Sequence, residues 1–231
     1  MGERNDSGGL LGVVDYGAGN LRSVENALAD LGASCRLVRR PKDLEGLSAL
    51  ILPGVGAFRD CVMNLRRQDL WEPAGEWVRA NRPYLGICLG YQILFEESEE
   101  HGGGRGLGVF AGRVVRFPRG DWKVPHMGWN RLELRDRDDP LWAGLPPDPY
   151  VYFVHSFFPR PEQEGLVAAW ADYGLRFAAA MRWGNVAATQ FHPEKSQAIG
   201  LRILRNFVAA TGVDLGGSPD FSLRAEVGTG E

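Results

Sequence analysis

The chain has 231 residues, a formal net charge of −3 at pH 7 and 44% apolar residues. This length suffices for one domain with a well-buried core, and the composition excludes a disordered or fibrous protein. The slight negative charge gives no electrostatic reason to expect binding to nucleic acid or to an anionic membrane.

The sequence carries no signal for a membrane or for export. No apolar run approaches the roughly 20 residues of a membrane-spanning helix, and the first nine residues lack the apolar segment of a signal peptide. The three cysteines, Cys35, Cys61 and Cys88, lack metal-ligand spacing, so free thiols are expected. We therefore predict a cytoplasmic protein with no metal ion and no other cofactor.

The first half of the chain alternates short apolar runs with stretches of helical periodicity. Apolar runs typical of buried strands lie at 10–15, 34–38, 49–52 and 84–87. Helical spacing covers 21–31 and, as a broken helix, 58–82, and Pro41 opens a short helical segment. This order predicts an α/β fold with an open, mostly parallel sheet, helices on both faces and ligands at the carboxyl ends of the strands.

The second half has a different rhythm, in which strands follow one another with Gly, Pro and Asp turns between them. These strands are expected at 107–117, 129–134, 150–157, 166–170, 176–182 and 186–190. They predict an antiparallel extension of the sheet, and a final helix is expected at 195–210. We predict one domain at 10–211, flanked by flexible tails at 1–9 and 212–231.

The sharpest local signal is GICLGYQ at 86–92, which joins an apolar strand to a stretch of helical character at 89–97. A nucleophile on a tight strand-to-helix turn needs very small residues two positions away on each side, as Gly86 and Gly90 are. Unpaired N–H groups at the start of a helix favour a thiolate at Cys88. The motif predicts a nucleophilic cysteine, with a buried structural cysteine as the alternative.

A thiolate that attacks an amide or ester needs a base, and the base needs a group that orients it. His192 and Glu194, in the segment QFHPEKS at 190–196, can fill these two roles. Pro193 disfavours helix at the residue before it, so we expect an extended run in which residues two apart project to the same side. The segment predicts a triad with Cys88, although in isolation it also fits a surface histidine beside a solvated glutamate.

The segment PGVGAF at 53–58 follows the third predicted strand and is expected beside Cys88. Gly54 and Gly56 allow unusual backbone dihedral angles on both sides of Val55. Backbone N–H groups here, with that of Leu89, can bind the oxyanion of a tetrahedral intermediate, a contribution of about 3 kcal/mol per donor. A plain glycine turn is the alternative.

Together these motifs resemble the class I (triad) glutamine amidotransferases, whose cysteine lies in a GxCxG elbow and whose histidine and glutamate lie in a late HPE. DYGAGN at 15–20, PHMGWN at 125–130 and YFVHSF at 152–157 follow in the same order. With them the chain resembles the members that form the amidotransferase subunit of imidazole glycerol phosphate synthase. The resemblance spans about 10–210 and implies a flavodoxin-like fold.

The resemblance also implies roles for single residues. Cys88 attacks the side-chain amide of L-glutamine, His192 protonates the leaving ammonia and then activates water, and Glu194 orients His192. The residues that match glutamine-binding or oxyanion positions are Gly54, Val55, Gly56, Leu89, Gln92, His155 and Ser156. The residues that match the face toward a partner are Asn20, Trp129 and Lys195.

Several residues outside the triad also have a purely structural interpretation. Asn20 can be a helix cap, Trp129 a core residue, Lys195 a solvated charge and His155 a hydrogen-bonded sheet histidine. His126 has no partner pattern in the sequence.

The partner implied by the resemblance is a cyclase subunit with a (β/α)8 barrel, which forms a heterodimer and receives ammonia along a protected path. Ammonia and a phosphoribulosyl aminoimidazole-carboxamide compound there give imidazole glycerol phosphate and an aminoimidazole-carboxamide ribotide, in histidine biosynthesis. Because glycines flank Val55, we hypothesise that a peptide flip completes the oxyanion site when the partner's substrate binds.

Three other functions remain open from the sequence. The chain can be the amidotransferase subunit of another synthase, for anthranilate or pyridoxal phosphate. It can be a catalytically silent docking module of the same fold, since a fold does not imply an activity. It can also be a small cysteine hydrolase that works without a partner.

Overall fold

The structure is a computed structural model that describes residues 9–17 and 20–216. Its largest element is an eight-stranded sheet in the order β2-β1-β3-β4-β14-β13-β12-β9. The parallel strands are β1 (Leu10–Val14), β2 (Cys35–Val38), β3 (Leu47–Gly54), β4 (Tyr84–Cys88) and β14 (Val186–Thr189). The antiparallel strands are β13 (Arg176–Trp183), β12 (Val167–Asp172) and β9 (Glu133–Leu134). The predicted sheet with its antiparallel extension is confirmed.

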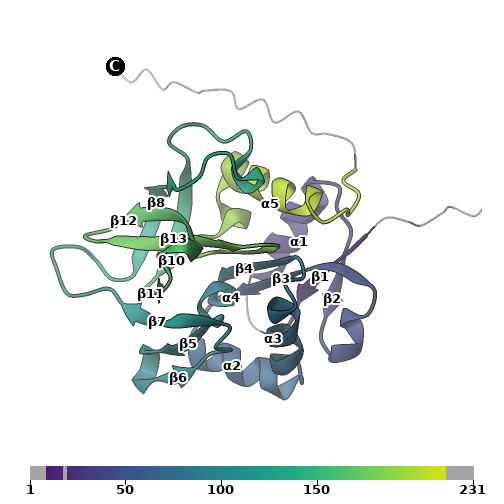
Figure 1. Cartoon of the computed structure of the whole chain (residues 1–231), viewed down its shortest axis with the longest axis horizontal. Helices are drawn as coiled ribbons and strands as arrows, with labels where there is room; N and C mark the ends of the chain where they lie inside the picture. Colours follow the sequence, from purple (N-terminus) through teal and green to yellow (C-terminus); the bar gives the residue numbers. More distant parts are fainter. Residues whose placement is uncertain (1–8, 18–19, 217–231) are drawn as a thin grey trace, which may run out of the picture.

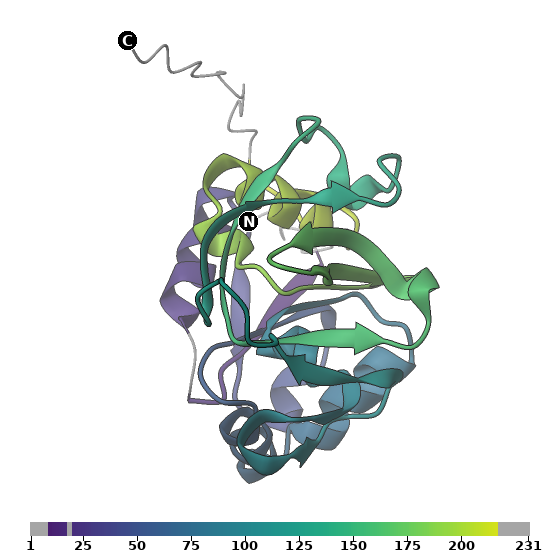
Figure 2. The ribbon, with the colours of Figure 1, turned by 90° about the vertical axis from the view of Figure 1, so that its left-hand side faces the viewer.

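Helices cover both faces of the parallel strands, as the sequence predicts. The bounds are α1 (Leu21–Asp30), α2 (Phe58–Arg67), α3 (Trp71–Arg79) and α5 (Gln197–Ala209). In Figure 1, α1 and α5 lie above the sheet, and α2 and α3 lie below it. Figure 2, turned by 90°, again shows α5 near the top of the molecule and the blue α2 and α3 near its bottom. Two apolar cores result, one including Leu28 and Phe207 and the other Phe58 and Trp77. In the described ranges no helix is long and apolar enough to cross a membrane.

Two smaller sheets stand beside the main one, and here the sequence analysis was partly wrong. One sheet pairs β8 (His126–Arg131) with β10 (Tyr150–His155), and the other has the order β11-β7-β5-β6. Its strands are β5 (Phe95–Ser98), β6 (Gly104–Arg105), β7 (Phe110–Arg116) and β11 (Phe157–Pro161). The predicted strand 150–157 is therefore divided at Ser156 between two sheets.

The helical character expected for 89–97 is also limited to four residues, α4 (Leu89–Gln92). The chain then enters β5, whose Phe95 is buried and pairs with Phe110 of β7. Pairing with a strand distant in sequence overrides the weak local preference for helix here. Short 3₁₀ turns complete the chain at Pro41–Leu44, Glu100–Gly102, Pro140–Trp142, Glu164–Leu166 and Pro193–Lys195.

Most of the predicted tails, 1–9 and 212–231, lie outside the described residues. Of their described residues, Gly9 donates a backbone hydrogen bond to Gly212 (3.2 Å), and Val213 is buried. The domain limits at 10 and 211 stay predictions.

The parallel strands end at one edge of the sheet, where three segments distant in sequence meet. Gly54 at the end of β3 pairs with Cys88 at the end of β4, and Thr189 of β14 pairs with Ile87. The segments that follow these strands are 55–57, α4 and 190–196. In open α/β sheets this edge is where ligands bind, so the topology gathers the predicted site there.

Candidate active site

Cys88 lies on a strained strand-to-helix turn. It is the last residue of β4 and precedes α4, with φ 55° and ψ −101°, a conformation that non-glycine residues rarely adopt. A Cβ on Gly86 would lie 2.4 Å from the Gly90 carbonyl oxygen, and a Cβ on Gly90 would lie 1.9 Å from the Leu52 carbonyl oxygen. Both glycines are therefore required sterically, as expected for a nucleophile elbow.

We expect Gly90→Ala to destabilise the chain by about 3 kcal/mol, because the clash is with the backbone of β3 and no side chain can move aside. Urea unfolding measures the change, and Gly165→Ala is the matched control, since a Cβ there meets nothing within 4 Å. Equal unfolding midpoints for the two variants would show that the elbow tolerates a methyl group.

His192 and Glu194 form a buried pair. Nδ1 of His192 lies 2.8 Å from Oε1 of Glu194, and their side chains are 1% and 2% exposed. The segment is not extended throughout: His192 is extended, but Pro193 begins a 3₁₀ turn that runs to Lys195. The expected contact is present, but a tight turn makes it, because proline is well suited to the first position of such a turn.

The free nitrogen of His192 is available to the cysteine. Cys88 and His192 line the same cavity of about 220 Å³, and Cys88 is 6% exposed. Nε2 of His192 is buried and has no hydrogen-bond partner among the described residues. Burial lowers the pKa of His192, but Cys88 and Glu194 outweigh it and raise this pKa to about 10. The imidazole is thus protonated at neutral pH and can give its proton to a leaving group beside Cys88.

Most other predicted site residues line this cavity as well. They are Val55, Gly56, Leu89, Gln92, His155 and Ser156. Gly54 lies just behind, where a Cβ would stand 2.5 Å from Cβ of Leu89. Leu89 is the first residue of α4, so its backbone N–H has no acceptor within the helix.

Four lining residues were not predicted: Glu100, Pro125, Val154 and Phe157. They lie inside or next to segments that carry the resemblance, but their residue types gave no chemical signal. Glu100 accepts a hydrogen bond from the backbone N–H of Phe58 (2.7 Å), which ties the loop after β5 to the start of α2.

His155 forms a hydrogen-bonded pair with His126, a contact that the sequence analysis missed. Nδ1 of His126 lies 3.1 Å from Nε2 of His155, and Nδ1 of His155 lies 2.8 Å from the Phe157 carbonyl oxygen. Burial lowers the pKa of His155 to about 3 and that of His126 to about 4, so both rings are neutral at pH 7. The pair joins β8 to β10, which no local pattern could indicate.

Gln92 presents one free polar atom. Its Nε2 donates to the Phe157 carbonyl oxygen (3.0 Å) and to Oε1 of Gln190 (3.1 Å). Its Oε1 is buried and has no partner among the described residues. Because Gln92 lines the cavity, this oxygen is suited to accept a hydrogen bond from a ligand's ammonium group.

Asn20, Trp129 and Lys195 do not line the cavity. Asn20 occupies the cap position of α1, but its side chain makes no capping hydrogen bond. Trp129 is 46% exposed and contacts Tyr152 edge to face, so it is not a core residue. Lys195 ends the turn that contains Glu194 and is partly buried.

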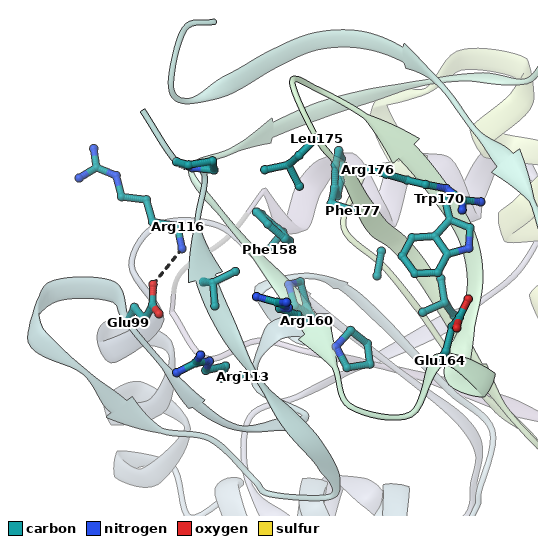
Figure 3. Close-up of a pocket in the computed structure, with 16 residues that line it drawn as sticks. Glu99, Arg113, Arg116, Phe158, Arg160, Glu164, Trp170, Leu175, Arg176 and Phe177 are labelled. Carbon is teal, nitrogen blue, oxygen red and sulfur yellow. Dashed lines mark hydrogen bonds between the residues drawn. The ribbon is translucent and has the colours of Figure 1, made fainter. Parts of the chain in front are cut away.

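A larger cavity, of about 680 Å³, lies elsewhere and contains none of the predicted residues. Its lining residues come mainly from β7, β11, β12 and β13. Figure 3 shows Phe158, Phe177 and Trp170 around it, with Arg160 among them and Arg116 at its edge. Chemistry, and not size, therefore identifies the candidate active site.

Comparison with known proteins identifies the family of the chain. The family model "Glutamine amidotransferase class-I" matches residues 12–211. The chain is 51% identical over 205 residues to the protein "Imidazole glycerol phosphate synthase subunit HisH" of Syntrophotalea carbinolica, covering 86% of this chain and 98% of that protein. It is 49% identical to the protein of that name from Methylococcus capsulatus, and the match covers 85% of this chain and 94% of that protein.

Solved structures give the same result for the fold. A structure described as "Crystal structure of glutamine amidotransferase" superposes with a TM-score of 0.70 at 28% identity, covering 89% of this chain and all of that one. "Structure of PurLQS from Thermotoga maritima" has a TM-score of 0.69 at 18% identity, covering 88% and 99%, and shows the fold alone. With the family model matched across most of its length, the chain belongs to the class I glutamine amidotransferases.

Proposed function

We propose that this chain is the glutaminase subunit of an imidazole glycerol phosphate synthase, which hydrolyses L-glutamine and passes the ammonia to a cyclase subunit. The observation that carries the proposal is the elbow cysteine beside an imidazole whose other nitrogen is bound by a buried glutamate. Relatives at about half identity that bear the name of this subunit support the choice of synthase.

The geometry supports a thioester mechanism. Sγ of Cys88, as a thiolate, attacks the amide carbon of glutamine, and His192 gives its proton to the departing ammonia. His192 then takes a proton from water, whose oxygen attacks the glutamyl thioester; the C–S bond breaks, the glutamate product leaves, and the Cys88 thiolate and the protonated His192 are restored. Glu194 keeps Nδ1 of His192 occupied, so the exchanged proton stays on Nε2, toward Cys88.

Substrate binding is assigned to the lining residues. Oε1 of Gln92 accepts a hydrogen bond from the α-ammonium group, and backbone near His155 and Ser156 holds the rest of the substrate. The backbone N–H groups of Leu89 and of the peptide around Val55 stabilise the oxyanion. Gly56 has φ +97°, so this peptide lies beside a residue whose conformation favours glycine.

The partner face is assigned to the surface that carries Asn20, Trp129 and Lys195. Large apolar side chains stand exposed on β8 and β10: Met127 (60%), Trp129 (46%) and Tyr150 (53%). Exposed apolar residues grouped on one small sheet are typical of an interface. We assign this face to a cyclase with a (β/α)8 barrel in a heterodimer.

We expect glutamine hydrolysis by the purified chain to be slow and to rise roughly 5- to 150-fold in complex with the cyclase bound to its ribulosyl carboxamide substrate, as for ordinary allosteric coupling. Release of glutamate is the measurement, with the cyclase added with and without its substrate. An anthranilate synthase component and a pyridoxal phosphate synthase subunit serve as control partners.

Each alternative predicts a different result in this assay. Full activity of the chain alone would show an independent cysteine hydrolase and would also exclude the peptide flip at Val55. Activation by one of the control partners would identify another synthase. No glutamate under any condition would leave a silent docking module.

A further inference from the structure

Gln190, in the QFHPEKS segment, contacts Cys88 directly. The proposed mechanism gives this residue no role. Gln190 follows β14, is fully buried, and its backbone N–H donates to the Ala179 carbonyl oxygen of β13 (2.8 Å). Its side-chain Nε2 lies 3.5 Å from Sγ of Cys88, within hydrogen-bond range for sulfur.

The orientation of the Gln190 amide is dictated by its neighbours. The Phe157 carbonyl oxygen can only accept, so Gln92 must turn its Nε2 toward it. The same Nε2 then donates to Oε1 of Gln190, which leaves only the NH2 group of Gln190 to face Cys88. The side chain therefore presents a hydrogen-bond donor, and not an acceptor, to the sulfur.

The Phe157 carbonyl also anchors the histidine pair. It accepts from Nδ1 of His155, so Nε2 of His155 accepts from Nδ1 of His126, and Nε2 of His126 faces Nδ2 of Asn130 (3.3 Å). A continuous chain of hydrogen bonds thus runs from β8, next to the exposed Trp129, to Sγ of Cys88. Each hydrogen bond in this chain has one donor and one acceptor, and no atom is required to play both roles.

We propose that Gln190 is a positioning residue for the nucleophile: its NH2 group, aligned by Gln92, donates a hydrogen bond that stabilises and orients the Cys88 thiolate. The inference rests on the proposed role of Cys88. A hydrogen bond to a charged acceptor is stronger than one to a neutral acceptor, so the contact favours the thiolate over the thiol. The hydrogen bond from Gln190 to Sγ is also kept while His192 gives its proton to the leaving ammonia.

Other titratable groups face Cys88 and stay unchanged in the test. They are His192, Tyr16, which lies two residues after β1, and Cys61 of α2; Glu100 and His155 line the same cavity. Burial raises the pKa of Tyr16 far above its usual range and that of Cys61 to about 12, so both remain neutral up to pH 10.

The test compares Gln190→Met, which keeps the size but removes both the donor to Cys88 and the acceptor for Gln92, with Gln190→Glu, which keeps the acceptor for Gln92 but turns an oxygen toward the sulfur. The readout is the rate at which iodoacetamide alkylates Cys88 between pH 5 and 10, measured by mass spectrometry of the Cys88 peptide. Gln163→Met, at an exposed glutamine, is the control.

For Gln190→Met we expect the pH of half-maximal alkylation to rise by about one unit and kcat for glutamine in the cyclase complex to fall roughly tenfold, the worth of one such hydrogen bond. KM should change less than kcat, because Gln92, which contacts the substrate, is still held by the Phe157 carbonyl oxygen. Gln190→Glu should shift the alkylation profile further than Gln190→Met, because a carboxylate repels the thiolate.

Which variant shifts the alkylation profile further decides whether Gln190 acts on the sulfur or only supports the surrounding structure. If Gln190 served only to hold Gln92, the glutamate variant would be the milder of the two, and the proposal would be wrong. Unchanged alkylation profiles in both variants, with Cys88 still labelled, would overturn this inference and leave the proposed function intact. No labelling of Cys88 in the unaltered chain would instead count against the proposed function itself.

Discussion

Replacement of Cys88 by alanine is expected to lower glutamine-dependent synthesis by the complex roughly 10⁴-fold or more, as loss of a triad nucleophile does in other hydrolases. Synthesis from free ammonium salts should be unchanged, because the cyclase performs that reaction without the glutaminase site. The measurement is formation of imidazole glycerol phosphate with glutamine or with ammonium as the nitrogen source.

Cys35→Ala is the matched control, since Cys35 is a free cysteine in β2 that is only partly buried. It should retain activity with both nitrogen sources. A glutamine-mimicking alkylating agent should label the unaltered chain at Cys88 and leave the Cys88→Ala chain unlabelled. Loss of ammonium-dependent synthesis in Cys88→Ala would contradict the division of labour between the subunits, and absence of labelling in the unaltered chain would favour a silent module.

Glu194→Gln is expected to lower kcat/KM for glutamine roughly 10²- to 10⁴-fold, because an amide can donate to Nδ1 of His192 and so stabilise the wrong tautomer. Cys88 and Glu194 together raise the pKa of His192 to about 10 against the effect of burial. Without the carboxylate this pKa falls, so the alkaline limb of the pH–rate profile should move to lower pH. The measurement is kcat/KM for glutamine from pH 6 to 10.5.

The same raised pKa affects stability with a definite sign. A histidine whose pKa is higher in the folded chain than the usual value near 6.5 stabilises the fold fully below that pH. This contribution is lost as the pH rises toward 10. Unfolding by urea at pH 6 and pH 10 should therefore show a smaller loss of stability with pH in Glu194→Gln than in the unaltered chain.

Glu76→Gln is the control for both experiments, since Glu76 is exposed on α3. It should leave the activity, its pH profile and the stability unchanged. An alkaline limb at the same pH in Glu194→Gln and Glu76→Gln would show that Glu194 does not set the charge of His192.

Local chemistry determined the parts of the site that the sequence analysis predicted. Gly86 and Gly90 indicated the elbow because only glycine fits where the backbone folds back on itself, and the structure shows both close contacts. The contact of Glu194 with His192 was expected because the two residues are neighbours in sequence. The backbone conformation of 192–195 was less predictable, because both a 3₁₀ turn and an extended run can bring residues two apart into contact.

Contacts between distant segments were beyond the sequence. His126 and His155 are 29 residues apart, and Gln190 and Cys88 are 102 apart, so neither pairing leaves a periodic or spacing signal. The division of 150–157 between two sheets and the early end of α4 have the same origin. In the last two cases a partner strand supplied backbone hydrogen bonds that local preference could not foretell.

The sequence by itself determined the α/β order, the glycine elbow and the residue types of the proposed triad, because steric limits and side-chain chemistry act over a few residues. Only the tertiary structure decided which polar atoms are available at the cavity. Nε2 of His192 and Oε1 of Gln92 have no hydrogen-bond partner in the part of the chain that the structure describes, and Gln190 turns a donor toward Cys88. The physical reason is that a buried hydrogen bond depends on direction and on distances of about 3 Å. Such positions are set by the packing of all strands and helices together.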